Sequence, residues 1–240
     1  MQIGPSRIEA GPSEGSTATV KGLEVSLDPA ASLARRQLLI DLRFAGARVD
    51  LRPNARGQVW VLPDLPPGKA PPPLQYRFRL GDPLQLRWHR PSGTPLAIQL
   101  AGQLQLAPRD HGIDGQLRAW MAGVGGEVDL NGKGQWRDHR WRLDLKPRHL
   151  DLRAARPLLP AGLQLQGQAS GALQISLERG RPGCVGMMTL RELRLGRAGM
   201  GQRLESEALP LRCQASGLQL EQAPWRFGAW RGRISGNLAG

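Results

Sequence analysis

The chain has 240 residues and a formal net charge of +13, and nearly all of its basic residues are arginine. Aromatic residues make up 5% of it, and its 31 glycines and 20 prolines argue against a large helical protein and favour many short strands joined by tight turns. Two cysteines, Cys184 and Cys213, are too few for a disulfide framework and lack the spacing of a metal or redox site.

The cysteines and the charge each leave two interpretations open. One bridge between Cys184 and Cys213, in an oxidising compartment, and two buried free thiols fit the sequence equally well. The positive charge attracts polyanions, either nucleic acid or anionic lipid headgroups. Arginine in place of lysine is also what a GC-rich genome produces, so the charge by itself assigns no partner.

The first third of the chain predicts strands around one short helix. Apolar and polar residues alternate over residues 20–27, 40–44, 49–51 and 59–61. Between the first two segments, Asp28 as N-cap and Pro29 at the first helical position predict a helix near residues 29–37. A Pro-rich turn or linker follows at residues 67–73.

Alternation then continues to the end of the chain, at residues 74–80, 84–88, 96–106, 113–117, 128–130, 141–145 and 163–177 and in three later segments. Helical character returns only in a turn or two at "LDLRAARPLLP". Turns every 8 to 15 residues predict consecutive antiparallel strands, because the helical crossovers of parallel sheets are missing. We therefore divide the chain into residues 1–66, the linker 67–73, and a continuing sheet over residues 74–240.

The predicted strands have an apolar face that two short helices cannot cover. Soluble proteins rarely expose more than a few hundred Å² of contiguous apolar surface. The sheet must therefore close on itself or curl into a trough that holds an apolar ligand. In the two longest alternating segments the residues of this face are Leu96, Ile98, Leu100, Leu104, Leu106, Leu163, Leu165, Leu173, Ile175 and Leu177.

Three glycines, Gly102, Gly167 and Gly171, lie on the same parity as these apolar residues. A missing side chain on the inner face lets a sheet bend tightly, so we expect these positions to be the bends of the trough. The alternative is that each is a simple β-bulge.

Two stretches resemble a known family. The first, "VSLDPAASLARRQLLIDLRFAGARVDLRPNARGQVWVLPDLP", matches at Asp28, Pro29, Leu33, residues 38–42, residues 49–51, Asn54, Gly57 and Trp60. The second, "HLDLRAARPLLPAGLQLQGQASGALQISL", matches at Leu150, Leu152, Leu158, Leu159, Pro160, Gly162, Gly167 and Gly171. Together they resemble the repeating units of AsmA-like and TamB-type envelope proteins, and the Pro-rich run and the arginine content resemble the cyanobacterial branch.

The resemblance implies an all-β fold, a long antiparallel sheet curled into an open hydrophobic groove. It implies a periplasmic or cell-envelope protein that carries phospholipid acyl chains between inner and outer membranes, or supports outer-membrane protein assembly. We expect this chain to be part of a longer protein. The resemblance implies that the inner-membrane anchor lies in another part of that protein, and that an Omp85-type barrel partner binds to a region outside this chain. No His or Cys pair has the spacing of metal ligands, so we expect no metal site, and we expect no cofactor.

Other functions have less support. His89, His111, His139 and His149 are scattered, and no serine or cysteine nucleophile stands at a recognisable elbow, so we expect no enzyme. A closed β-repeat protein with a structural or adhesive role at the cell surface is the main alternative. A basic nucleic-acid binder is a minor one, because Tyr76, Phe78, Trp88 and Trp141 share the apolar parity and not the arginine face.

Overall fold

The computed structural model describes residues 1–238 except 10–14, 55–73, 90–94, 109–111, 136, 161, 179–180, 198, 200 and 215–216. The chain divides into two compact units: unit 1 is Met1–Ala122 with Gly132–Asp138, and unit 2 is Gly123–Asn131 with His139–Gly240. Both consist of strands with one short helix each among the described residues, which confirms the predicted all-β class. The predicted strand at 59–61 and the linker 67–73 lie outside the described residues, and the predicted division of the chain stays a prediction.

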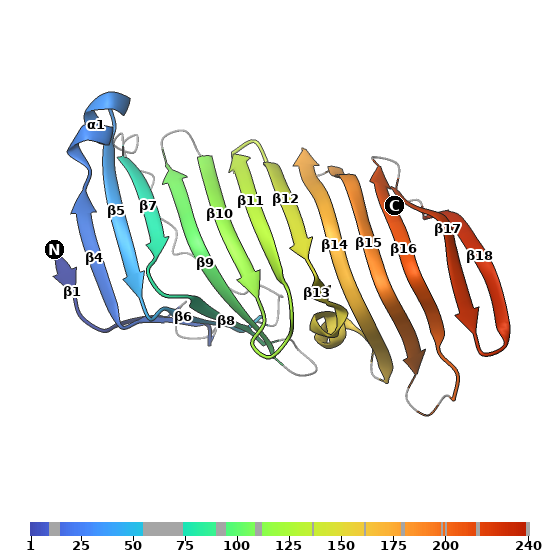
Figure 1. Cartoon of the computed structure of the whole chain (residues 1–240). Coiled ribbons are helices and arrows are strands. Elements are labelled where there is room, and N and C mark those ends of the chain that lie inside the picture. Colours follow the sequence, from blue (N-terminus) through green and yellow to red (C-terminus); the bar gives the residue numbers. More distant parts are fainter. Residues whose placement is uncertain are drawn as a thin grey trace. The chain divides into compact units, whose positions relative to one another are not determined.

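Unit 1 is a sheet of mostly short strands (Figure 1, blue to green). Its elements are β1 (Gln2–Ile3), β2 (Ser6–Glu9), β3 (Thr17–Val20), β4 (Gly22–Leu27), α1 (Pro29–Arg35), β5 (Leu38–Ala45), β6 (Arg48–Leu51), β7 (Leu74–Leu80), β8 (Leu84–Trp88), β9 (Leu96–Ala107) and β10 (Gly112–Trp120).

Consecutive short strands of unit 1 are the halves of longer, broken strands. β3 and β4, β5 and β6, and β7 and β8 are separated by breaks that contain Lys21, Gly46 and Gly81. The breaks are neighbours in the sheet, because the Lys21 N–H donates to Ala45 O at 3.0 Å and the Gly81 N–H to Phe44 O at 2.8 Å. Long β9 crosses the line of breaks unbroken, pairing with β8 through its first half and with β7 through its second.

Two strand pairs of unit 1 differ from the expected antiparallel order. β5 pairs with β7, and β6 with β8, in parallel. The remaining pairs, β1–β4, β2–β3, β3–β6, β4–β5, β7–β9, β8–β9 and β9–β10, are antiparallel. A connection between parallel strands needs a dozen or more residues. Residues 52–73, which link β6 to β7, are more than enough.

Unit 2 is a single sheet of longer strands (Figure 1, gold to red). Its elements are β12 (Arg140–Arg148), β13 (Leu150–Asp151), the 3₁₀ helix η1 (Leu152–Leu158), β14 (Leu163–Glu178), β15 (Arg181–Arg197), β16 (Leu204–Gln214), β17 (Gly217–Phe227) and β18 (Trp230–Leu238). The residues of β11 (Glu127–Gln135) are divided between the two units. β12 and β13 both pair antiparallel with β14, and from β14 to β18 each strand pairs antiparallel with the next. Within the described residues of unit 2 no pairing joins β18 back to β12, so this part of the sheet is open.

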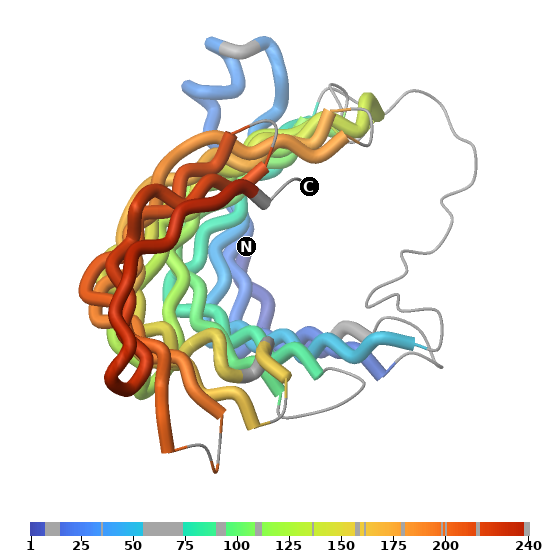
Figure 2. Tube along the Cα trace, turned by 90° about the vertical axis from the view of Figure 1, so that its right-hand side faces the viewer, coloured from blue at the N-terminus to red at the C-terminus, as the bar shows by residue number. Residues whose placement is uncertain are grey.

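The strands of unit 2 follow a curved path (Figure 2, orange to red). Four residues other than glycine have positive φ in the described part of unit 2: His139 at 48°, in the turn before β12, His149 at 47°, Glu192 at 52° and Gln222 at 34°. The strand register shifts between Gln166 and Gln168 and again between Leu220 and Ala223. Bulges of this kind bend a strand and increase its twist, so they account for the curvature.

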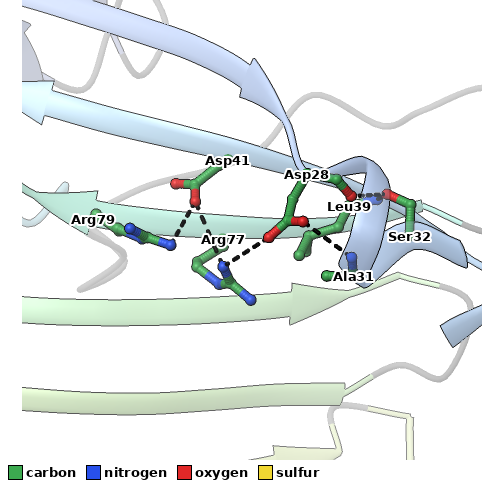
Figure 3. A network of polar contacts seen from close by, with 7 residues as sticks. All are labelled: Asp28, Ala31, Ser32, Leu39, Asp41, Arg77 and Arg79. Atoms are coloured by element: carbon green, nitrogen blue, oxygen red, sulfur yellow. Dashed lines mark hydrogen bonds and ion pairs between the residues drawn. The ribbon is translucent and has the colours of Figure 1, made fainter. Parts of the chain in front are cut away.

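Helix α1 begins where the sequence predicts. Asp28 is its N-cap, with a side-chain oxygen that accepts from the Ala31 N–H at 3.0 Å, and Pro29 occupies the first turn. Ser32 joins α1 to the sheet, because its hydroxyl accepts from the N–H of Leu39 at 2.9 Å (Figure 3). The second predicted turn is η1, capped by Asp151.

An ion-pair network anchors the start of α1 to β5 and β7 (Figure 3). Arg77 lies 3.8 Å from the Asp28 carboxylate and 3.6 Å from that of Asp41, and Arg79 lies 2.8 Å from Asp41. Asp41 lies directly opposite Arg77, so the network occupies one face of these strands.

Candidate functional site

The five leucine and isoleucine residues predicted on β9 occupy its alternate positions and lie opposite apolar partners. The opposed pairs are Leu96 with Trp88, Ile98 with Leu86, Leu100 with Leu84 and Ala119, Leu104 with Phe78, and Leu106 with Tyr76 and Ile113. Directly opposed residues share one face of a sheet. The predicted residues of β9 therefore form part of one apolar face.

This face extends over the neighbouring strands of unit 1. Tyr76 lies beside Ile40 and Phe78 beside Leu42, and the ring of Phe78 lies 6.1 Å from that of Phe44. We define the apolar face of unit 1 as the apolar residues that these pairings join: Leu23, Val25, Leu27, Leu38, Ile40, Leu42, Phe44, Leu74, Tyr76, Phe78, Leu80, Leu84, Leu86, Trp88, Leu96, Ile98, Leu100, Leu104, Leu106, Ile113 and Ala119.

The residues predicted on β14 form a second apolar face, in unit 2. Leu173, Ile175 and Leu177 lie opposite Leu145, Leu143 and Trp141 of β12. Leu165 begins a row that crosses five strands, through Leu195, Leu204, Phe227 and Trp230. Leu163, the fifth predicted residue, lies opposite Arg197 instead of an apolar residue. These residues, Arg197 excepted, are the apolar face of unit 2.

Sequence reasoning found these faces only in part. Leu195, Leu204, Phe227 and Trp230 were not among the residues assigned to the groove, although they lie in segments with visible alternation. The missing information was the strand register, which decides which residues of neighbouring strands form a row.

Helix η1 covers one part of the apolar face of unit 2. Leu152 of η1 packs with Ala169 and Leu193 in a buried cluster. Away from it, the face is open to solvent in the described part of unit 2: the exposed fraction is 39% for Trp141, 40% for Ile175 and 75% for Trp230. A stripe of large apolar side chains is therefore left without a second layer of described structure.

The glycines predicted as bends adopt positive φ, at 131° for Gly102, 127° for Gly167 and 154° for Gly171. A Cβ atom on Gly102 would lie 2.1 Å from the backbone oxygen of Gln116, on the neighbouring strand, so no other residue fits there without a backbone shift. The strand register shifts opposite Gly167, where β15 has two residues, Glu192 and Leu193, against one on β14. A role as bends of a groove stays a prediction for all three.

A disulfide joins Cys184 of β15 to Cys213 of β16, with 5.6 Å between the two Cα atoms. This separation lies within the usual range for a disulfide. The bridge decides between the two interpretations of the cysteines that the sequence left open.

Opposite the apolar face of unit 2, the sheet carries charged residues. Arg194, Glu205, Arg226 and Arg231 lie side by side on β15 to β18. The pKa of the Glu205 carboxyl is below its usual value because Arg226 hydrogen-bonds to it, with smaller contributions from the charges of Arg194 and Arg203. The strands that carry the apolar row on one face thus carry three arginines and one glutamate on the other face.

The described residues show little that is typical of catalysis. No group of three or more His, Cys, Asp or Glu side chains among them is placed to hold a metal ion. His89 Nε2 lies 3.3 Å from the Asp50 carboxylate, as an isolated pair, and His111 lies outside the described residues. None of the described helices is long and apolar enough to cross a membrane.

The apolar faces of the two units, with side chains such as Trp230 exposed, are thus the candidate binding surfaces of the described structure. Comparison of the chain with protein families, curated proteins and solved structures finds no match, so the resemblance to AsmA-like and TamB-type proteins stays a prediction.

Proposed function

We propose that this chain is part of an AsmA-like or TamB-type envelope protein, and that its apolar faces carry phospholipid acyl chains between membranes. The observation that carries the proposal is the row of apolar residues that runs across strands of unit 2 and ends at the exposed Trp230. Such a row, without a second layer over it, suits a ligand that is itself long and apolar.

The energetics support an acyl chain as the ligand. Burial of a CH₂ group from water contributes about 0.8 kcal/mol, so an acyl chain laid along such a row gains several kcal/mol in total. The next rows along β12 and β14, Leu145 with Leu173, Leu143 with Ile175 and Trp141 with Leu177, offer similar places for an acyl chain. On β15 these rows continue through Gly186, Cys184 and Pro182, which are smaller. A lipid would then move from row to row without any chemical step, so the proposal assigns no catalytic residue.

The disulfide supports a location in the cell envelope. Disulfides form and persist in oxidising compartments such as the bacterial periplasm and are rare in the cytosol. The bridge between Cys184 and Cys213 therefore fits the periplasmic location that the resemblance implies.

The proposal is tested by purifying the chain from a bacterial periplasm and extracting it for lipid mass spectrometry. We expect phospholipid to co-purify and to be lost when Ile175→Asp and Leu143→Asp place charges on the apolar face. The matched control is Ser176→Asp and Thr189→Asp, which adds the same charge on the polar face of β14 and β15. A lipid-free, monodisperse monomer that takes up no fluorescent acyl probe contradicts the proposal and favours the closed β-repeat alternative.

A further inference from the structure

The ends of three strands in unit 2 place an apolar and a charged row back to back. Leu204, Phe227 and Trp230 are opposed on β16, β17 and β18, at the end of the apolar face. The next residues along these strands, Glu205, Arg226 and Arg231, are also opposed, and lie on the other side of the sheet. At these strand ends the apolar row on one face and the charged row on the other face are therefore one residue apart along each strand.

Arg194, Arg203, Arg226 and Arg231 gather at this place, and we call them the arginine cluster. Arg194 lies opposite Glu205, and Arg226 donates to the Glu205 carboxylate with Nε at 3.1 Å. The pKa of that carboxyl is below its usual value, first because of the Arg226 hydrogen bond and to a smaller extent because of the charges of Arg226, Arg194 and Arg203. Within the described part of the chain, Arg231 has no ion pair.

A pocket of 390 Å³ adjoins the cluster, with both arginines of β17 and β18, Arg226 and Arg231, in its lining. Trp225 and Ser206 line it as well. Ser206 is 6% exposed, and its hydroxyl has no hydrogen-bond partner among the described residues. Ser206 lies directly opposite Leu193 and is the neighbour of Glu205 along β16, so its hydroxyl is on the apolar side of the sheet and not on the side of the arginines.

The charge of this region fits a phosphate group. The pocket lining contains two arginines, Arg226 and Arg231, and two glutamates, Glu205 and Glu207. Arg194 and Arg203, which lie outside the lining, add positive charge at Glu205, so the four guanidinium groups of the cluster exceed these two carboxylates only when the surroundings of the pocket are included. Arginine side chains bind phosphate oxygens through two parallel N–H donors, and their length lets them reach past a strand end.

We propose that the arginine cluster binds the phosphate of a phospholipid whose acyl chains lie against Leu204, Phe227 and Trp230. This inference rests on the proposed function and adds a headgroup site to it. Trp230 ends the apolar row, at the first residue of β18, and is 75% exposed there. An indole at the exposed end of an apolar row suits an amphiphile, because its ring contacts acyl chains while its N–H remains near polar groups.

The test compares two lipids with the same acyl chains on the full chain. Diheptanoyl phosphatidylglycerol and diheptanoylglycerol, both below their micelle concentrations, are titrated by native mass spectrometry. We expect the phospholipid to bind about tenfold more tightly than diheptanoylglycerol, because only the phospholipid has a phosphate that accepts charge-assisted hydrogen bonds from the arginines. The double variant Arg203→Gln and Arg231→Gln should remove this preference and leave the affinity for diheptanoylglycerol unchanged.

The charge-matched control is Arg142→Gln with Arg181→Gln, at strand ends of β12 and β15 in the same unit, and it should keep the preference. Equal binding of both lipids in the unmodified chain overturns the headgroup site and leaves the proposed function standing. Absence of binding by either lipid overturns both. Inorganic phosphate that binds as tightly as the phospholipid identifies a site for free phosphate and also overturns the inference.

Discussion

Leu143 of β12 lies directly opposite Ile175 of β14, and the exposed fractions of these two side chains are 36% and 40%. Opposed aliphatic residues in a closed sandwich would be covered by a second sheet. In unit 2 the buried cluster of Leu152, Ala169 and Leu193 lies at η1 instead. The same apolar face is therefore buried at η1 and exposed at Ile175. A substitution at the buried place should mainly lower stability, and a substitution at the exposed place should mainly affect binding.

Ile175→Ala should lower the free energy of unfolding by about 1 kcal/mol or less, because its side chain is substantially exposed. Leu193→Ala, in the buried cluster, should lower it by about 2 to 5 kcal/mol. Urea unfolding of both variants measures the difference. Equal losses would mean that Ile175 is packed in a closed core, as the β-repeat alternative requires.

Gly102→Ala should destabilise unit 1 by about 1 to 3 kcal/mol, because φ is 131° and a Cβ would lie 2.1 Å from Gln116 O. Gly22→Ala is the matched control in β4, where a Cβ would meet nothing within 4 Å. The control should change stability by less than about 1 kcal/mol. Thermal unfolding compares the two, and a neutral Gly102→Ala would contradict the close approach of β9 and β10.

Replacement of both Cys184 and Cys213 by serine should lower the free energy of unfolding by about 3 to 4 kcal/mol. The bridge spans a sequence separation of 29, and the loss follows from the loop entropy that the unfolded chain regains. Peptide mapping without reductant should recover the two cysteines as one linked pair. Recovery of two free thiols from periplasmic protein would contradict the bridge and weaken the argument for an envelope location.

The Glu205 pair gives unit 2 a pH dependence of predictable sign. The folded-state pKa of this carboxyl is lowered below its usual value of 4.5, first by the Arg226 hydrogen bond. Its contribution to stability is therefore fully present above about pH 4.5 and is lost as the pH falls through the lowered folded-state value. Unfolding measured from pH 7 downward should show Glu205→Gln converging with the unmodified chain, and a constant difference would contradict the pair.

Local sequence signals predicted much of the fold. Asp28 and Pro29 located α1, because cap and first-turn preferences act within a few residues. Alternation located β9 and β14 and assigned their faces, since the side chains of a strand alternate whatever its partner is.

The features that the sequence did not predict depend on distant residues. The parallel pair β5–β7 and the bonded cysteines require knowledge of which segments become neighbours. The positive φ of Glu192 and Gln222 cannot be predicted from their residue types, because glycine is the residue that usually adopts positive φ. The arginine cluster was equally invisible, since its members come from β15 to β18 and from the residue before β16.

The central claim, that the apolar face binds acyl chains, is tested most directly by a photo-crosslinking residue placed at Ile175 or at Ser176. These neighbours lie on β14 with their side chains on opposite faces of the sheet. After irradiation of periplasmic protein, mass spectrometry should find phospholipid adducts at position 175 and none above background at position 176. Equal labelling at the two positions, or labelling at 176 alone, would contradict the account.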